Sequence, residues 1–227
     1  MPVGISADAL CVISGAALGF AAGGRMSEDI KSKLNIVFGI AALSMGIVSI
    51  PLLKNLPAVV LSVIAGSLAG FLLKLGRSVS SVAGCLLKGK ATEEFITAAV
   101  LFCVSGTGYY GSLCEGMTGD SSILLAKAIM DFFTAMVFAC RLDKKVELLG
   151  IPQFVIHMII FLIAGWVYPL CSASMVADFK ACGGIIMLAT GLRMLGIVDA
   201  PVVEMIPSII IVMPVSYWWS TYILPLL

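Results

Sequence analysis

Apolar residues in this sequence form long, continuous runs instead of alternating with polar residues. About eight of these runs approach the roughly 20 residues that an α-helix needs to cross a hydrocarbon core of ~30 Å. A membrane-spanning strand would alternate with period two, so the runs predict helices. The expected spans lie near residues 5–24, 33–53, 56–75, 94–113, 121–141, 149–170, 176–197 and 201–225. We therefore expect an all-α integral membrane protein, with 176–197 as its weakest span.

The composition excludes most soluble alternatives. Hydrophobic residues make up 60% of the 227 residues, charged residues make up 12%, and the mean hydropathy is +1.11. A soluble domain of this length would carry far more charge. No P-loop, HExxH, GxSxG, EF-hand or dinucleotide motif occurs, and the seven cysteines form no CxxC pair. We expect a single membrane domain over 1–227 that is not an enzyme, uses no cofactor or metal, and binds no nucleic acid.

Basic residues fall unevenly on the two sides of the predicted spans. The loops after odd-numbered spans hold eleven of them, the opposite loops hold only Lys54 and Lys180, and Lys127 lies within a span. Those eleven are Arg25, Lys31, Lys33, Lys74, Arg77, Lys88, Lys90, Arg141, Lys144, Lys145 and Arg193. Because Lys and Arg collect on the cytoplasmic side, both termini are expected outside the cytoplasm of a prokaryotic inner membrane. Aromatic residues near predicted outer ends, such as Tyr217 and Trp219, agree with this orientation.

Two further segments have a simple interpretation. The first 24 residues contain no Lys or Arg, so we expect a retained first helix and no cleavable signal peptide. The long loop 76–93 has apolar residues at helical spacing, which is typical of a short helix on the inner leaflet or of a plain connector.

Two parts of the chain resemble each other at an offset of 145 positions. The matching positions are Gly39 with Gly184, Ile40 with Ile185, Leu43 with Leu188 and Gly46 with Gly191. Spans 1–3 (5–75) and 6–8 (149–225) would then be inverted copies around a central pair at 94–141. Inverted repeats occur in many secondary transporters, with the binding site near the membrane midplane. Chance similarity between glycine-rich membrane helices explains the matches equally well.

Small residues recur every four positions in two of the spans. Such faces let helix backbones approach closely. They are formed by Gly15, Gly19 and Gly23 in the first span and by Ser62, Gly66 and Gly70 in the third. They serve either packing within the chain, which we favour, or contact between two copies, so a homo-oligomer stays open.

The fifth span carries two charges inside the membrane. Lys127 and Asp131 lie one helical turn apart, so their side chains are spaced to pair. At ~1.5 Å per residue, Asp131 lies roughly 16 Å below Asp120, near mid-membrane. A charge there costs roughly 2.5–3.5 kcal/mol on insertion scales, so the pair forms either a transport site or a lock between helices. In a transport site, Lys127 would attract an anionic group and Asp131 would bind a coupling proton or sodium ion.

A glycine-rich segment precedes this span. Residues 105–122 read SGTGYYGSLCEGMTGDSS and are expected to break the helical pattern on the outer side. Thr118, Asp120 and Ser121 stand where the next helix starts, and free backbone N–H groups at such a start attract anions. Asp120 or Ser121 could equally be the cap of that helix.

Three polar residues stand out in the second half of the chain. Glu204 precedes Pro207 by three positions, and the proline is expected to kink the eighth span and free carbonyl groups nearby. Arg193 could pair with Glu204 or Asp199, or simply reach the interface. His157 in the sixth span is a candidate proton relay or a hydrogen-bonded packing residue.

The order of these motifs resembles a known family. The segments that carry the likeness are EEFITAAVLFCVSG, GSLCEGMTGDSSILLAKAIMDFFTA, ACGGIIMLATGLRMLGI and EMIPSIII. They are similar to segments of the bacterial membrane proteins of the domain-of-unknown-function 554 family, over nearly the whole chain. The resemblance implies a membrane transport protein with no settled substrate, and it supports the choice of Asp120, Lys127 and Asp131. Arg193 and Glu204 stand where the family pattern usually has Asn, so either the charge preference differs or the two residues compensate as an ion pair.

The residues and the resemblance together favour a secondary transporter for a small anionic or zwitterionic solute, with the lipid bilayer as its surroundings. The expected site residues are Thr118, Asp120, Ser121, Lys127, Asp131, Arg193 and Glu204. Spans 1–3 would rock against spans 6–8 around the central pair, and residues 116–121 would form an outer gate. One alternative is a channel whose glycine-rich segment re-enters the membrane as a filter. The other is a scaffold or regulatory subunit without flux of its own.

Overall fold

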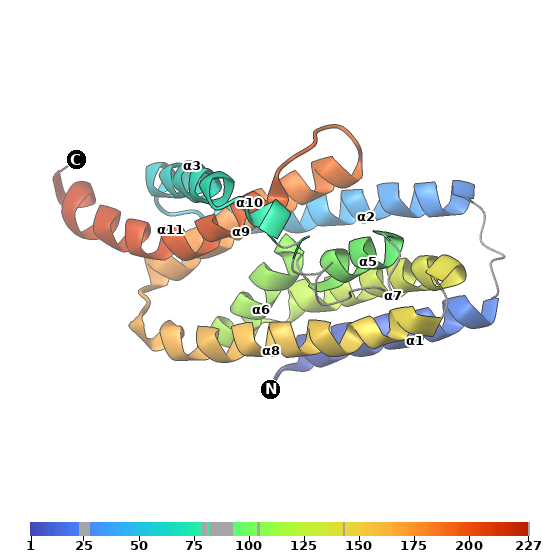
Figure 1. Ribbon diagram of the computed structural model, residues 1–227. Helices are drawn as coiled ribbons and strands as arrows, with labels where there is room; N and C mark the ends of the chain where they lie inside the picture. Colours follow the sequence, from blue (N-terminus) through green and yellow to red (C-terminus); the bar gives the residue numbers. More distant parts are fainter. Residues whose placement is uncertain (23–27, 79–80, 82–92, 104, 143, 227) are drawn as a thin grey trace. The chain divides into compact units, whose positions relative to one another are not determined.

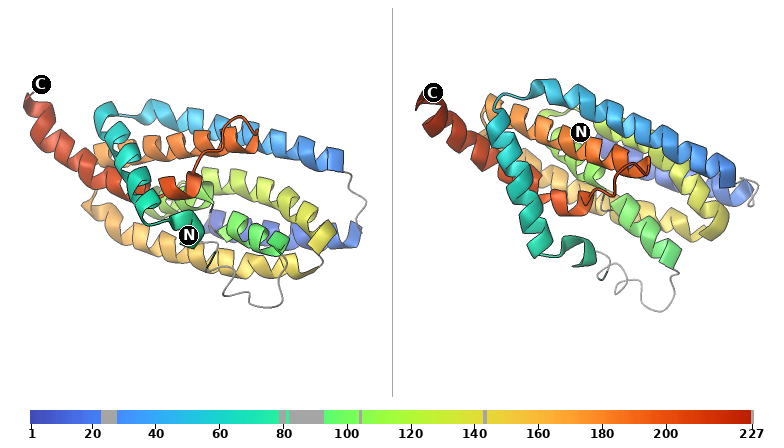
Figure 2. Two further views of the ribbon diagram at one scale, coloured as in Figure 1. Left: turned by 45° about the horizontal axis from the view of Figure 1, so that its top comes forward. Right: turned by 90° about the horizontal axis from the view of Figure 1, so that it is seen from above.

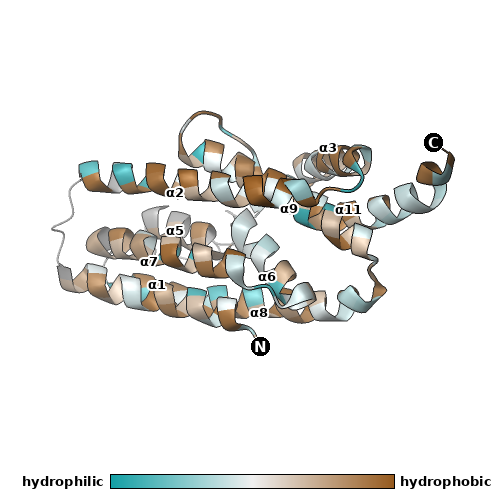
Figure 3. Ribbon diagram, turned by 180° about the vertical axis from the view of Figure 1, so that it is seen from behind, coloured by the Kyte–Doolittle hydropathy of each residue, from teal (hydrophilic) through white to brown (hydrophobic). Residues whose placement is uncertain are grey.

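The computed structural model describes residues 1–22, 28–78, 81, 93–103, 105–142 and 144–226, and its regular elements are all helices (Figure 1). Among these described residues, six helical stretches are long and apolar enough to cross a membrane. They are Val3–Ala21, Ser32–Leu52, Ser122–Cys140, Lys144–Leu170, Ala173–Met194 and Val202–Leu226. In the hydropathy colouring of Figure 3, hydrophobic residues occur along the whole length of the long helices and hydrophilic residues are few. The predicted all-α membrane protein is confirmed, and the predicted number of eight spans is only approximate.

Three predicted spans differ from a single long helix: the third, the fourth and the eighth, which is divided into two helices. The third is the shorter helix α3, Leu56–Leu72, and the fourth is divided into α5, Glu93–Cys103, and α6, Gly106–Thr118. The weakest predicted span, 176–197, is a full helix, α9, Ala173–Met194. The expected helix in the loop 76–93 falls largely outside the described residues.

Contacts between helices divide the chain into two compact units. Unit 1 comprises Met1–Val37 and Arg77–Tyr168, and unit 2 comprises Phe38–Gly76 and Pro169–Leu227. The division predicted from the sequence, at 5–75, 94–141 and 149–225, stays a prediction.

Unit 1 is built on a close pair of helices, α1 (Val3–Ala22) and α7 (Ser122–Leu142). A Cβ atom on Gly15 would overlap the main chain of Phe132, and one on Gly19 would overlap the main chain of Met136. The thiol of Cys140 donates a hydrogen bond to the Gly19 carbonyl over 3.3 Å. Gly15 and Gly19 therefore serve packing within the chain, as we favoured, and Gly23 lies outside the described residues.

Unit 1 also contains α8 (Gly150–Val167), which follows the 3-10 turn η2 (Lys144–Leu149) and is followed by the 3-10 turn η3 (Tyr168–Leu170). The helices α5 and α6 follow one another beside α8 (Figure 2). Ser105 is the N-cap of α6, because its Oγ accepts a hydrogen bond from the Gly108 N–H over 3.0 Å.

The glycine-rich segment 105–122, which we expected to break the helical pattern, is helical over residues 106–118, of which 106–113 also lay within the predicted fourth span. Glycines in this stretch allow close contact with other helices: a Cβ on Gly116 would lie 2.5 Å from the Phe161 carbonyl oxygen. Packing thus overrides the low helix propensity of glycine. Between residues 106 and 122 the chain leaves the helical conformation at residues 119–121, where Gly119 has a φ of 75°.

Unit 2 contains the C-terminal part of α2 (Glu28–Ser49), η1 (Ile50–Leu52), α3 and α9. It also contains α10 (Val202–Met205), α11 (Pro207–Trp218), the π-helical turn η4 (Trp219–Ile223) and η5 (Leu224–Leu226). The predicted interruption near Glu204 is confirmed, since α10 ends at Met205 and Pro207 begins α11. The small-residue face of α3 packs internally, with Gly66 against Ser208 and Gly70 against the main chain of Glu204.

Glycines also bring α2 and α9 together. A Cβ on Gly46 would lie 2.7 Å from the Gly184 carbonyl oxygen and 2.9 Å from Leu188 Cγ. A Cβ on Gly191 would lie 2.7 Å from the Gly39 carbonyl oxygen. Each helix thus presents two glycines to the backbone of the other.

Candidate functional site

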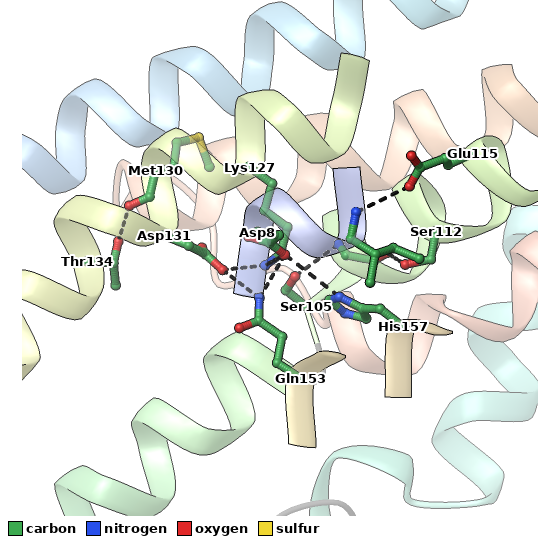
Figure 4. Close-up of polar contacts among 12 residues, drawn as sticks. Asp8, Ser105, Ser112, Glu115, Lys127, Met130, Asp131, Thr134, Gln153 and His157 are labelled. Atoms are coloured by element: carbon green, nitrogen blue, oxygen red, sulfur yellow. Dashed lines mark hydrogen bonds and ion pairs between the residues drawn. The ribbon is translucent and has the colours of Figure 1, made fainter. Parts of the chain in front are cut away.

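Five polar side chains from three helices meet in the interior of unit 1. Asp8 comes from α1, Lys127 and Asp131 from α7, and Gln153 and His157 from α8 (Figure 4). Asp8, Gln153 and His157 are 0% exposed, Lys127 is 1% exposed and Asp131 is 8% exposed. Two carboxylates and an ammonium group buried this completely must be paired to be tolerated.

Lys127 lies between the two carboxylates. Its Nζ is 2.8 Å from Asp8 Oδ2, and it also donates a hydrogen bond to Asp131 Oδ2. The Nε2 of Gln153 donates to the same two oxygens, over 2.7 Å to Asp8 and 3.1 Å to Asp131. The predicted pairing of Lys127 with Asp131 is confirmed, and Asp8 and Gln153 extend it into a closed ring of hydrogen bonds. We call Asp8, Lys127, Asp131, Gln153 and His157 the polar cluster.

Helical spacing explains how so few elements supply the polar cluster. Lys127 and Asp131 lie four residues apart on α7, and so do Gln153 and His157 on α8, so each pair shares one face of its helix. An apolar core made by α1, α5, α7 and η2 lies in the same unit and includes Val12, Ala16, Phe102, Ala135 and Val146. In such surroundings an ion pair is electrostatically stronger, and losing one partner costs more.

The polar cluster leaves several buried atoms without a partner. Among the described residues, nothing forms a hydrogen bond with Asp8 Oδ1, Gln153 Oε1 or either ring nitrogen of His157. His157 Nδ1 lies 3.7 Å from Asp8 Oδ2, beyond ordinary hydrogen-bond length. Buried polar atoms are satisfied in the large majority of cases, so four exceptions at one place call for an explanation.

The interruption between α5 and α6 lies next to the polar cluster. A Cβ on Gly108, in the first turn of α6, would lie 2.6 Å from His157 Nε2. The ring of Tyr109 stands edge-on to the His157 ring, with centroids 6.4 Å apart. The first turn of a helix carries backbone N–H groups without intrahelical partners and a partial positive charge. Gly106, Thr107 and Gly108 bring that turn into the buried interior of unit 1.

Thr118 is the last residue of α6, Asp120 and Ser121 lie in the turn between α6 and α7, and none of the three belongs to the polar cluster. Asp120 Oδ1 accepts a hydrogen bond from the Ser122 N–H over 3.0 Å. Thr118 Oγ1 donates to the Cys114 carbonyl over 2.8 Å and accepts from the Asp120 N–H over 3.3 Å. The bond of Asp120 to the first N–H group of α7 agrees with the capping alternative that we considered for Asp120.

Arg193 and Glu204 belong to unit 2. Arg193 Nε lies 3.4 Å from Asp199 Oδ1, and the two side chains are 51% and 94% exposed. Of the two partners predicted for Arg193, the structure therefore selects Asp199. A Cβ on Gly76 would lie 2.5 Å from Glu204 Oε1, so this carboxylate stands against the short helical stretch 75–78 that follows α3.

Sequence reasoning missed Asp8. The signal was present, because Asp8 is the one charged residue in the first 24 positions. An acid in an otherwise apolar span is unexpected unless it has a partner. That partner is 119 positions away, so nothing local to the sequence identifies it.

Two other buried acids behave differently. Glu115 accepts hydrogen bonds from the Gly4 N–H over 2.7 Å and the Ile5 N–H over 3.2 Å, at the start of α1. Asp178 accepts from the backbone N–H groups of residues 54 and 55, from the Asn55 side chain and from Ser216 Oγ, all within 2.9 Å. Both acids hold the start of a neighbouring helix, which is a structural role.

Comparison with known proteins relates the chain to one protein family and to two bacterial proteins. The sequence pattern of the family described as "Protein of unknown function (DUF554)" matches residues 3–217. The chain is 40% identical to the "Uncharacterized protein YqgA" of Escherichia coli (strain K12), over 98% of this chain and 99% of that protein. It is 24% identical to the "Uncharacterized membrane protein YdfK" of Bacillus subtilis (strain 168), over 90% and 91% of the two chains. No solved structure matches.

Proposed function

The chain belongs to the DUF554 family, and we propose that it is a secondary transporter of the prokaryotic inner membrane that moves a small solute past the polar cluster of unit 1. The observation that carries the proposal is the set of unpartnered buried atoms in the cluster. A purely structural carboxylate in the same chain looks different, since four donors surround the oxygens of Asp178. Charged groups held inside a membrane with free hydrogen-bonding capacity are typical of solute and ion pathways.

The divided helix supports the same proposal. Discontinuous membrane helices whose ends meet polar groups are a common way to build binding sites in secondary transporters. Here the first turn of α6 adjoins His157 of the polar cluster. Lys127 already binds two carboxylates, so an anionic group of the solute would bind better at the α6 N-terminus than at Lys127.

Reciprocal contacts support an inverted repeat, which suits alternating access. If residue i corresponds to residue i+145, a contact of Gly46 with Leu188 requires one of Gly191 with Leu43. A Cβ on Gly46 would lie 2.9 Å from Leu188 Cγ, and one on Gly191 would lie 2.7 Å from Leu43 Cγ. In unit 1, Asp8 and Gln153 are also 145 positions apart and are hydrogen bonded to each other.

A channel with a glycine-rich filter is less well supported. A filter of that kind needs non-helical backbone whose carbonyl groups line the path. Residues 106–118, which hold most of the glycines, form the helix α6. We therefore retain the transporter as the better explanation of the polar cluster.

The test uses a matched pair of aspartates. Asp29 and Lys33 form an exposed ion pair at the same four-residue spacing as Lys127 and Asp131. Wild type, Asp131→Asn and Asp29→Asn would be reconstituted in liposomes, and solid-supported-membrane currents recorded against small carboxylates, amino acids and inorganic ions. We expect a saturable current in wild type and in Asp29→Asn, and none in Asp131→Asn.

Two results would contradict the proposal. If no solute drives a current through the wild type, the protein has no flux of its own and the scaffold alternative is favoured. If Asp131→Asn carries the wild-type current while remaining folded, the polar cluster is not the transport site. Large currents that do not saturate would indicate a channel instead.

A further inference from the structure

We propose that the Asp8–Asp131 pair holds one exchangeable proton and that this proton is the coupling ion, with His157 passing it to and from the pair. The proposal deepens the proposed function and rests on it for the coupling role. The proton site itself can be tested without any solute.

The charged groups of the polar cluster do not balance when all of them are ionised. The polar cluster contains two carboxyl groups and one ammonium group, all of them buried. With both carboxyl groups ionised the cluster carries one net negative charge, which a low-dielectric interior strongly disfavours. One proton on the pair makes the cluster neutral. Because both carboxyl groups bind the same two donors, the proton belongs to the pair and not to either residue alone.

The neighbouring titratable groups do not change this count. Glu115 of α6 is engaged with backbone N–H groups of α1, and the ring of Tyr109 stands against His157. Cys11 of α1 and Cys103 of α5 lie within electrostatic reach of Asp131. None of these groups is a cation, so within the described part of the chain Lys127 alone balances the pair.

The hydrogen bonds of the polar cluster also favour a proton on Asp8. The Oδ2 atoms of Asp8 and Asp131 each accept two donors, while Asp8 Oδ1 accepts none. A proton on Asp8 Oδ1 turns that atom into a donor. A neutral imidazole offers one acceptor nitrogen and one N–H, and both ring nitrogens of His157 are unpartnered. A bond from the protonated carboxyl to His157 would satisfy two of these atoms at once.

The geometry also makes His157 the exchange route. Its Nδ1 is 3.7 Å from Asp8 Oδ2. A small rotation of either side chain would bring this nitrogen within hydrogen-bond range of the Asp8 carboxyl group. Its Nε2 points toward the first turn of α6 at Gly108, on the other side of the ring. The two ring nitrogens thus connect the carboxyl pair with the interruption between α5 and α6. In this route the Asp8 carboxyl breaks its O–H bond and forms an N–H bond at Nδ1, and Nε2 gives its own proton to a water molecule that enters at the first turn of α6, so the imidazole returns to neutral.

A metal cation fits the cluster less well than a proton. Hard cations in proteins take about six oxygen ligands. In the described part of the cluster the oxygens without a partner are Asp8 Oδ1 and Gln153 Oε1. No group of three or more His, Cys, Asp or Glu residues suited to a metal occurs in the described ranges. A proton needs one oxygen only.

The test is infrared difference spectroscopy of the purified, folded protein as the pH is changed. A protonated carboxyl gives a carbonyl band that shifts on deuteration and on ¹³C labelling of aspartate. We expect such a band in wild type, Asp29→Asn and Glu115→Gln. We expect its loss in Asp8→Asn and equally in Asp131→Asn, because either change leaves one carboxylate facing one ammonium group. A band that survives in both variants, or its absence from wild type across the pH range of folding, would overturn the proton site.

Aspartate labelling keeps the test valid if Asp8→Asn does not fold, since it assigns the band in the wild type, and Asp131→Asn then serves as the variant. The relay is tested with His157→Gln, which we expect to keep the band and to slow its deuterium exchange at least tenfold. An unchanged exchange rate in a folded variant would overturn the role of His157.

Transport separates this inference from the proposed function. A solute current that moves protons, measured with a pH-sensitive dye inside the liposomes, would support both. An infrared band together with silent transport would support the proton site and overturn the transporter. A current without the band, or one that moves no protons, would keep the transporter and overturn proton coupling.

Discussion

At the scale of single residues, Lys127 holds two acids that would otherwise face each other without a cation. Lys127→Met keeps most of the side-chain volume and removes the charge. We expect the free energy of unfolding to fall by about 3–5 kcal/mol, the usual effect of removing one partner from a buried pair. Lys33→Met is the matched control, since Lys33 pairs with Asp29 in the open, where such pairs contribute at most ~1 kcal/mol.

Thermal or denaturant unfolding in detergent measures both variants. Adding Asp131→Asn to Lys127→Met leaves a single carboxyl group where there were two and should recover part of the lost stability. If Lys127→Met unfolds like Lys33→Met, the ammonium group does not hold the cluster together.

The same residues show how far sequence reasoning reaches. The pairing of Lys127 with Asp131 could be predicted, because both lie on one helix and helical spacing alone brings them together. The partners Asp8 and Gln153 could not, because they come from α1 and α8 and meet α7 only after the chain has folded. Asp120 was predicted as a site residue because of the glycine-rich segment before it, yet its hydrogen bond to the Ser122 N–H is a local one.

At the scale of elements, the contact of α1 with α7 depends on glycine. Gly15→Ala would place a methyl group against the main chain of Phe132. Main-chain atoms cannot move aside as a flexible side chain can. We expect a loss of about 1–3 kcal/mol in the free energy of unfolding, as for other overpacked sites. Gly165→Ala in α8 is the control, because its nearest contact is an ordinary 3.6 Å to the Gly116 carbonyl oxygen.

Without a clash, Gly165→Ala should be neutral or stabilising by up to about 1 kcal/mol, through its better helix propensity. Both variants can be measured by the loss of helical circular dichroism on heating. Equal stability of the two would mean that α1 can shift away from α7 without cost.

Elements were predictable where one physical effect dominates. The long apolar runs gave α1, α7, α8 and α9 within a few residues, because the bilayer fixes the length of a spanning helix. The interruption at Pro207 followed from its missing N–H group. The glycines of 105–122 were ambiguous, because the same residue that weakens a helix also lets helices pack closely. Their helical conformation depends on contacts with α8, which no local pattern encodes.

At the scale of the whole molecule, composition tells which segments enter the membrane but not which helices pack together. Within unit 1, α1 lies against α7, more than a hundred positions away, and within unit 2, α3 lies against α11. The offset of 145 positions was the one long-range signal in the sequence, and the reciprocal contacts of α2 with α9 agree with it. Four matching residues alone could not distinguish duplication from chance similarity. Reciprocal contacts add a second requirement, because the matching residues must also occupy equivalent positions in space.

The orientation in the membrane gives the last prediction. If α5 and α6 together make one crossing, the number of crossings is even and both termini lie on one side, which the basic residues place outside. In a background without cysteine, Pro2→Cys, Lys54→Cys and Thr221→Cys should react with a membrane-impermeant thiol reagent on intact cells. Lys33→Cys and Lys144→Cys should react only after the cells are permeabilised.

Each departure from this pattern has its own meaning. Reaction at Pro2→Cys but not at Thr221→Cys would show an odd number of crossings, which would require α5 and α6 to enter and leave the membrane from the same side. Reversal at all five positions would keep the even number and put both termini inside, against the distribution of Lys and Arg. Denatured samples of every variant should react fully, which controls for thiols hidden by packing and not by the membrane.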